Sequence, residues 1–83
     1  KEFFSFLEIL RINNFNISDV KNYYYFTNKR WDLKLHNDTL IKFPHKNLDD
    51  FVLIAQSIIK NKNFNKKKVI DLRIPNQVII SYE

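Results

Sequence analysis

The stretch WDLKLHNDTLIKFP, residues 31–44, decides the fold of this chain. Its first five residues alternate apolar and polar side chains, which is the period of a β-strand with one buried face. The alternation resumes at Ile41 and Phe43 after a polar break, and Pro44 ends it. This pattern predicts a β-hairpin whose buried face carries Trp31 and the other apolar side chains at odd positions.

The loop between the two strands has to keep these odd positions on one face. A sheet with one buried side fixes its register by its apolar residues, so odd residues pair with odd residues and the loop length is odd. We predict the three-residue loop His36-Asn37-Asp38, a type I turn followed by a left-handed residue at Asp38. A two-residue loop would instead pair Leu33 with Lys42 and place a charge in the core.

Two amphipathic helices are expected outside this hairpin. Over residues 1–14 the apolar side chains fall at i, i+3, i+4 and i+7, namely Phe3, Phe6, Leu7 and Leu10. A second helix starts after Asn47, which we expect to cap it, with Asp49 and Asp50 at the positive end of the helix dipole. Its apolar residues recur at helical spacing: Leu48, Phe51, Val52, Ala55, Ile58 and Ile59.

Residues 17–35 are rich in β-branched and aromatic side chains. We expect a turn at Thr27-Asn28-Lys29-Arg30 between two strands, and the alternative is a bend within one long ribbon. The run Tyr23-Tyr24-Tyr25-Phe26 precedes this turn. Consecutive strand residues point to opposite faces, so at least two of these four rings must leave the core. We expect another domain or chain to cover part of that surface.

A second hairpin is expected at the end of the sequence. Residues 60–68 contain five lysines and read as a solvated loop. Residues 69–74 and 78–82 then alternate around the turn Pro75-Asn76-Gln77. This turn would place Ile70, Leu72 and Ile74 opposite Tyr82, Ile80 and Val78.

These elements predict an α+β fold. The sheet is expected to be mainly antiparallel, built from two hairpins plus one or two further strands, with both amphipathic helices packed on one face. With 83 residues, the chain is a single domain or a fragment of one. It begins at Lys1 rather than Met, so we expect a piece of a longer protein.

The composition excludes several classes of site. Without glycine there is no Gly-rich phosphate loop, and without cysteine there is no disulfide, thiolate nucleophile or cysteine zinc site. The two histidines, His36 and His45, show no metal-ligand spacing, and we expect both to be solvated surface residues. No spacing of Ser, His and carboxylate residues indicates catalysis. We therefore expect a protein that is not an enzyme and has no catalytic residue, cofactor or metal.

Nucleic-acid binding is the alternative that the charge leaves open. The net charge is +5, and thirteen aromatic residues could supply stacking surfaces. The candidate phosphate contacts are Lys60, Lys62, Lys66, Lys67 and Lys68. Most of the aromatic residues, however, fall on apolar stripes that the core requires, so we expect no nucleic acid as partner.

The last strand, residues 78–82, is expected to lie at an edge of the sheet. It would pair with residues 70–74 on one side and, unless another strand follows, offer backbone donors and acceptors on the other. An exposed edge of this kind can take up a strand from a partner. The alternative is a plain edge strand that the twist of its sheet, or residues missing from this sequence, protect.

Three segments resemble one family of proteins. Arg30-Trp31-Asp32-Leu33 is followed by a polar turn and by Ile41-Lys42-Phe43-Pro44, and a helix separates these from Val69-Ile70-Asp71-Leu72-Arg73-Ile74-Pro75. In this order they resemble the C-terminal part of the β domain of the bacterial cell-division protein family FtsQ/DivIB. Asp38 stands where the family usually has glycine, and Phe43 stands for a common leucine.

The resemblance implies a non-enzymatic scaffold of the division septum on the periplasmic side of the cell inner membrane. Its partners would be FtsB and FtsL type division proteins, and a partner segment would dock by adding a strand to the last strand of the domain. The membrane anchor and the POTRA domain of the family are absent from this sequence. The implied partner-binding residues are Arg73, Ile74, Val78, Ile79, Ile80, Ser81 and Tyr82. Arg73 would pair either with a partner carboxylate or with Asp71, and Trp31 would be a core residue.

Overall fold

The computed structural model describes residues 2–60, 68–74 and 77–82. Its helices and strands follow the order α1 (Glu2–Ile12), the 3-10 helix η1 (Ile17–Asp19), β1 (Val20–Tyr25), β2 (Trp31–Leu35), β3 (Leu40–Lys42), α2 (Leu48–Ile59), β4 (Lys68–Asp71) and β5 (Ile79–Tyr82). The strands form a five-stranded sheet in the order β1-β2-β3-β4-β5. The predicted α+β class with two α-helices is therefore confirmed.

Both predicted hairpins are present and the sheet is mainly antiparallel, but it is mixed because one pair of neighbouring strands is parallel, which was not expected. Neighbouring strands pair antiparallel except for β3 and β4, which run in the same direction. The reason is the position of α2, because a helix between two strands carries the chain back across the sheet before the second strand begins. Thus β4 adds beside β3 as the second strand of a β-α-β unit.

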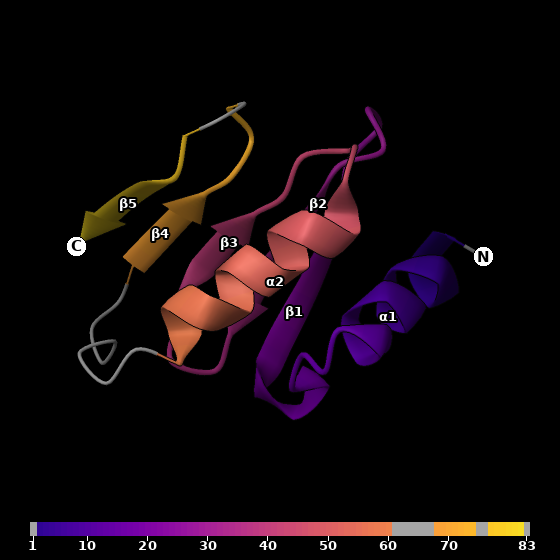
Figure 1. Cartoon of the computed structure of the whole chain (residues 1–83), viewed down its shortest axis with the longest axis horizontal. Helices are drawn as coiled ribbons and strands as arrows, with labels where there is room; N and C mark the ends of the chain where they lie inside the picture. Colours follow the sequence, from indigo (N-terminus) through magenta and orange to yellow (C-terminus); the bar gives the residue numbers. More distant parts are fainter. Residues whose placement is uncertain (1, 61–67, 75–76, 83) are drawn as a thin grey trace.

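Both helices lie on one face of the sheet (Figure 1). Phe6 and Leu10 of α1 and Val52 and Ala55 of α2 are buried in one cluster with the odd-numbered side chains of β2. The ring of Phe6 stacks on that of Trp31 with centroids 4.7 Å apart and planes tilted by 2°. Trp31 is therefore a core residue, as predicted. The β4–β5 hairpin extends beyond α2 at one side of the sheet (Figure 1).

The hairpin of β2 and β3 has the predicted register. Leu33 pairs with Ile41, and the loop of residues 36–38 closes with hydrogen bonds between Leu35 and its neighbours across the turn. Asp38 adopts the left-handed conformation with φ 67°. The odd-numbered side chains of this hairpin are buried as expected. The apolar pattern and the odd loop thus suffice to determine this part of the fold.

The strand β1 is an edge strand that pairs with β2 through the predicted turn at residues 27–30. The register shifts between Val20 and Asn22, so a β-bulge returns both Val20 and Tyr23 to the core face. Tyr24, Tyr25 and Phe26 are exposed to 42%, 44% and 40%, which confirms that at least two of the four rings leave the core.

The hairpin of β4 and β5 is present, but its predicted register is wrong by two residues. Ile70 lies opposite Ile80, and Lys68 lies opposite Tyr82. A shift by two leaves every side chain on its predicted face, so an alternating pattern alone cannot distinguish the two registers. In the predicted turn, Pro75 and Asn76 lie outside the described residues, as do residues 61–67 of the expected lysine-rich loop.

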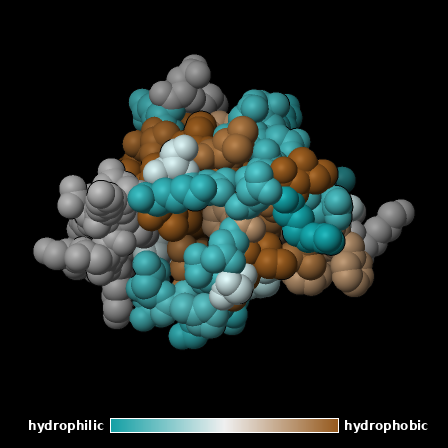
Figure 2. All heavy atoms as spheres, turned by 60° about the horizontal axis from the view of Figure 1, so that its bottom comes forward, coloured by the Kyte–Doolittle hydropathy of each residue, from teal (hydrophilic) through white to brown (hydrophobic). Residues whose placement is uncertain are grey.

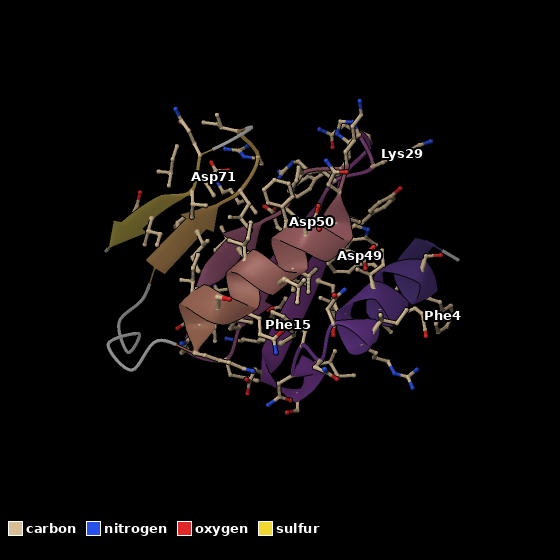
Figure 3. All side chains as sticks on the ribbon, in the orientation of Figure 1. Phe4, Phe15, Lys29, Asp49, Asp50 and Asp71 are labelled. Atoms are coloured by element: carbon tan, nitrogen blue, oxygen red, sulfur yellow. The ribbon has the colours of Figure 1, made fainter. Side chains whose placement is uncertain are left out.

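Asn47 is the N-cap residue of α2 as predicted, but the expected capping by its side chain is wrong. Asn47 precedes α2 in the left-handed conformation, with φ 57°, and its side chain makes no capping hydrogen bond. Of the two acidic residues in the first turn, Asp49 accepts a hydrogen bond of 2.9 Å from the amide of Asn13 at the end of α1. Figure 3 shows Asp49 on the side of α2 that faces α1. Asp49 therefore helps to join the two helices.

Candidate functional site

Among the described residues, β5 pairs only with β4 and forms one edge of the sheet. The predicted edge position of this strand is thus confirmed. At the opposite edge lies β1. Charged residues, proline or a covering helix commonly protect edge strands. The described residues of β5 are Ile79, Ile80, Ser81 and Tyr82, and none of them is charged or proline.

The hydrogen bonds of β4 determine which backbone groups of β5 point outward. Leu72 donates its N–H to the carbonyl of Lys42 over 2.9 Å, so the polar backbone groups of Leu72 face β3. Successive residues of a strand direct these groups to alternate sides, so those of Asp71 face its partner Ile79 on β5. Ile80, the next residue, therefore directs its N–H and C=O to the free edge of the sheet.

The side chains along this edge are apolar and half exposed. The exposed fractions are 41% for Ile74, 45% for Val78, 40% for Ile79 and 37% for Ile80, and Ser81 is exposed as well. Ile80 lies opposite the buried Ile70 and shares its face, whereas Ile79 lies on the helix-free face beside Asp71. A strand added at this edge would cover apolar side chains on both faces of the sheet.

Arg73 and Asp71 form a bidentate ion pair next to this strand. The guanidinium donates hydrogen bonds of 2.9 and 2.7 Å to the two carboxylate oxygens of Asp71. The hydrogen bond from Arg73 lowers the pKa of Asp71 to about 2. The same bond raises the pKa of Arg73, whose side chain remains 42% exposed. Of the two partners considered for Arg73, the structure therefore places Asp71 in contact with it.

Charged residues continue from this pair along the helix-free face of the sheet. In one row across the strands, Asp32 lies opposite Lys42, and Lys42 lies opposite Asp71. Arg30 donates a hydrogen bond of 2.6 Å to Asp32, which is only 5% exposed. Burial raises the pKa of the Asp32 carboxyl, against the opposing effect of Arg30. The two arginines are thus each held in place by an aspartate.

A pocket of about 440 Å³ opens at the end of the sheet where β3 and β4 finish. Its lining includes the side chains of Arg30, His45, Lys46 and Arg73, and no carboxylate is among its described lining residues. Apolar side chains, including Phe51 and Leu72, form another part of its wall. Such a wall fits an anionic group attached to an apolar one.

The pocket and the edge of β5 adjoin through one residue pair. Arg73 lines the pocket, and its partner Asp71 lies directly opposite Ile79 of β5. Figure 3 shows Asp71 near the end of β4. Arg73 therefore connects the wall of the pocket with the hairpin of β4 and β5.

The structure thus brings most residues of the predicted site together at the β4–β5 hairpin, namely Arg73, Ile74, Val78, Ile79, Ile80 and Ser81. Tyr82 also belongs to β5, but its side chain lies outside the described set. His45 and Lys46 were missed as site residues. Both are exposed, as predicted for His45, and they precede a helix. Their proximity to Arg30 and Arg73 depends on the parallel pairing of β3 with β4, which the alternating pattern does not indicate.

Neither a metal centre nor a membrane helix emerges from the described ranges. No group of three or more His, Asp and Glu residues there is arranged to hold a metal ion. No helix in the same residues has the length and apolar character needed to cross a membrane. Of the lysines considered for nucleic-acid contact, Lys62, Lys66 and Lys67 lie outside the described residues.

Comparisons of the chain with protein-family models, curated proteins and solved structures found no match.

Proposed function

We propose that this chain is a non-enzymatic binding module that takes up a protein partner by β-strand addition to β5. The resemblance to the FtsQ/DivIB family suggests the setting, a scaffold of the cell-division machinery on the periplasmic side of the inner membrane. The partners proposed on the same basis are FtsB and FtsL type proteins.

The observation that carries this proposal is the free edge of β5. Its backbone groups at Ile80 point away from β4, and the side chains of Ile79 and Ile80 are 40% and 37% exposed. In strand addition, main-chain hydrogen bonds supply affinity and register, while alternate side chains supply specificity. The edge has both kinds of group available, and the side chains of Ile79 and Ile80 would contact opposite faces of the added strand.

The cationic pocket adds a requirement on the partner. A partner segment that pairs with β5 and then continues across the end of the sheet toward β4 would bring an acidic residue near Arg73, Lys46 and His45. Arg73 is already bonded to Asp71 by both carboxylate oxygens, so it can serve as a fixed positive group without losing this pair. Lys46 and His45 would supply the contacts that the partner gains.

Hydrogen exchange tests the proposal. We expect a synthetic peptide from the C-terminal part of FtsB to protect the amide of Ile80, which faces the free edge. The variant Ile80→Pro lacks this donor but keeps the backbone groups of Ile79 and Ser81 that face β4. It should lose most of the affinity for the peptide while the exchange of β2 and β3 is unchanged.

The control variant is Phe4→Ala, because Phe4 is 72% exposed on α1 and lies away from β5 (Figure 3). This variant should bind the peptide as the parent chain does. Unchanged exchange at Ile80 in the presence of saturating peptide would contradict strand addition at this edge. Binding to single-stranded nucleic acid that weakens steeply with added salt would favour the alternative function instead.

A further inference from the structure

We infer that two copies of this chain pair with each other through β5, and that this pairing competes with the strand of the partner. The inference rests on the proposed function, because both events use the free edge of β5. Among the described residues, β5 pairs only with β4, and Ile79–Tyr82 includes neither a charged residue nor a proline. An edge strand without such protection is a template for pairing with another chain.

The outward backbone groups of β5 decide the register of this pair. The N–H and C=O of Ile80 face the free edge, and by alternation those of Tyr82 do so as well. In an antiparallel pair, residues whose backbone groups face the edge lie opposite each other. Ile80 opposite Ile80 of the second copy meets this condition and joins residues 78–82 of both copies over their whole length. A displacement by one residue would set outward groups against inward ones, and a displacement by two would leave part of each segment unpaired.

The side chains that this register brings together are apolar or small. Ile80, which is 37% exposed, would contact its own counterpart on the helix-covered face of the sheet. Ile79, which is 40% exposed on the other face, would lie opposite Ser81 of the second copy. Each contact occurs twice about a twofold axis, so the assembly closes after two copies and does not continue into a fibre.

The arrangement of the helices leaves room for the second copy. The β4–β5 hairpin extends beyond α2, and no helix lies in front of β5 (Figure 1). A twofold axis perpendicular to the sheet places the helices of both copies on one face, with the two hairpins between them. Five residues from each copy are far fewer than the roughly 20–30 on each side of a stable interface. We therefore expect a weak dimer that dissociates on dilution and then leaves the edge free for a partner.

Sedimentation equilibrium of the full chain tests the pairing. The weight-average mass should rise from 10.1 kDa toward twice this value as the protein concentration increases from micromolar to millimolar. Each copy carries a net charge of +5, so added salt should screen the repulsion and increase the fraction of dimer. A mass that remains at 10.1 kDa at millimolar concentration overturns the inference.

A charge on the edge separates pairing through β5 from other association. Ile80→Lys sets two positive charges against each other at the twofold axis, so this variant should stay monomeric at millimolar concentration. The matched control is Ile12→Lys, because Ile12 is 65% exposed and ends α1. It should form as much dimer as the parent chain. Association of Ile80→Lys to the same extent as the parent chain overturns the inference.

Single cysteines test the register, because the chain has no cysteine of its own. In Ile80→Cys the two thiols lie on directly opposite residues, whose Cα atoms are about 5.5 Å apart in such a pair, so mild oxidation should give a covalent dimer. Val78 is 45% exposed, but its counterpart lies four residues along the second strand, at about 13 Å. Val78→Cys should therefore give little covalent dimer. Equal yields from the two variants overturn the inference.

The FtsB peptide separates this inference from the proposed function. Saturating peptide should dissociate the dimer, because one edge cannot hold two strands. A chain that is monomeric at every concentration, with peptide that protects the amide of Ile80, would overturn the pairing and leave strand addition intact. A dimer that Ile80→Lys abolishes, in a chain that binds no peptide, would overturn the proposed function and support the pairing. Peptide that binds without dissociating the dimer would overturn the competition.

Discussion

Four residues hold left-handed backbone conformations in the described part of the chain, and none of them is glycine, because the chain contains none. Asn14, Asp38 and Asn47 have φ between 57° and 67°, and Asn and Asp are the residues that tolerate this region best after glycine. Lys29, with φ 65°, has no short polar group to bond the local backbone. The turn between β1 and β2 is therefore the most strained of the four positions.

At Lys29 we expect glycine to stabilise the protein. The variant Lys29→Gly relieves a left-handed conformation that costs about 1 kcal/mol in a residue with a β-carbon, although greater freedom of the unfolded chain offsets part of this gain. Lys29→Val should destabilise the protein, since a β-branched residue fits this region worst. Urea unfolding at constant pH measures both effects. Asp38→Gly serves as the comparison and should gain less stability than Lys29→Gly. A loss of stability in Lys29→Gly would contradict the strain inferred at this position.

The pair of Asp71 and Arg73 makes stability depend on pH in the acid range. The pKa of Asp71 is about 2 in the folded chain, below its ordinary value of 3.8, so the pair contributes stability above pH 4. This contribution is lost as the pH falls toward 2. Arg73 is 42% exposed and solvent screens the pair, so we expect about 1 kcal/mol rather than the full value of the shift. In urea unfolding, Asp71→Asn should therefore have a lower free energy of unfolding than the parent chain at pH 6. Near pH 2 the two free energies should be equal.

At the scale of the elements, a strand pairing could be predicted from the sequence only where the apolar pattern excludes the other registers. The β2–β3 hairpin could be predicted because its only competing loop would place Lys42 in the core. The β4–β5 register could not, since pairing Ile70 with Tyr82 or with Ile80 leaves the same residues on the same face. The bulge at the start of β1 and the parallel pairing of β3 with β4 depend on tertiary packing, which local periodicity does not describe.

Engineered disulfides can test the register of β4 and β5, because the chain has no cysteine that would interfere. Val69 and Ser81 are directly opposite, so the double variant Val69→Cys with Ser81→Cys should oxidise readily, with Cα atoms within the 4.4–6.8 Å range of native disulfides. Asp71→Cys with Ser81→Cys would be opposite only in the register shifted by two residues. Mass spectrometry after mild oxidation should find the first bond in monomeric protein and little of the second. Preferential oxidation of the second pair would support the shifted register.

At the scale of the whole molecule, two helices cover the middle of the sheet and leave its ends exposed. On the face seen in Figure 2, hydrophobic atoms reach the surface in several places between hydrophilic side chains. Large apolar or aromatic residues remain exposed at both edges of the sheet, such as Tyr25 on β1 and Val78 before β5. The edge part of the candidate site could be predicted, since a terminal strand in an alternating hairpin tends to lie at an edge. The pocket could not, because it forms only when β4 returns beside β3.

This arrangement predicts a gradient of local stability across the sheet. The strands β2 and β3 have neighbours on both sides and helices above them, so their amides should exchange only on near-global unfolding. The strand β5 has a single neighbour and no helix in front of it (Figure 1), so its amides should exchange through local opening. Within β5, Ile80 should exchange faster than Ile79 and Ser81, since its N–H faces the free edge.

Native-state hydrogen exchange followed by NMR measures this gradient residue by residue in low concentrations of denaturant. Amides of β2 and β3 should report the free energy of global unfolding. The amides of Ile79 and Ser81 should report a smaller free energy of local opening, which varies little with denaturant. Addition of a peptide that extends the sheet should slow Ile80 most, because it alone of the three gains a hydrogen-bond partner. If Ile80 were already as well protected as Leu33 in the free chain, β5 would not be a free edge, and strand addition would have to take place elsewhere.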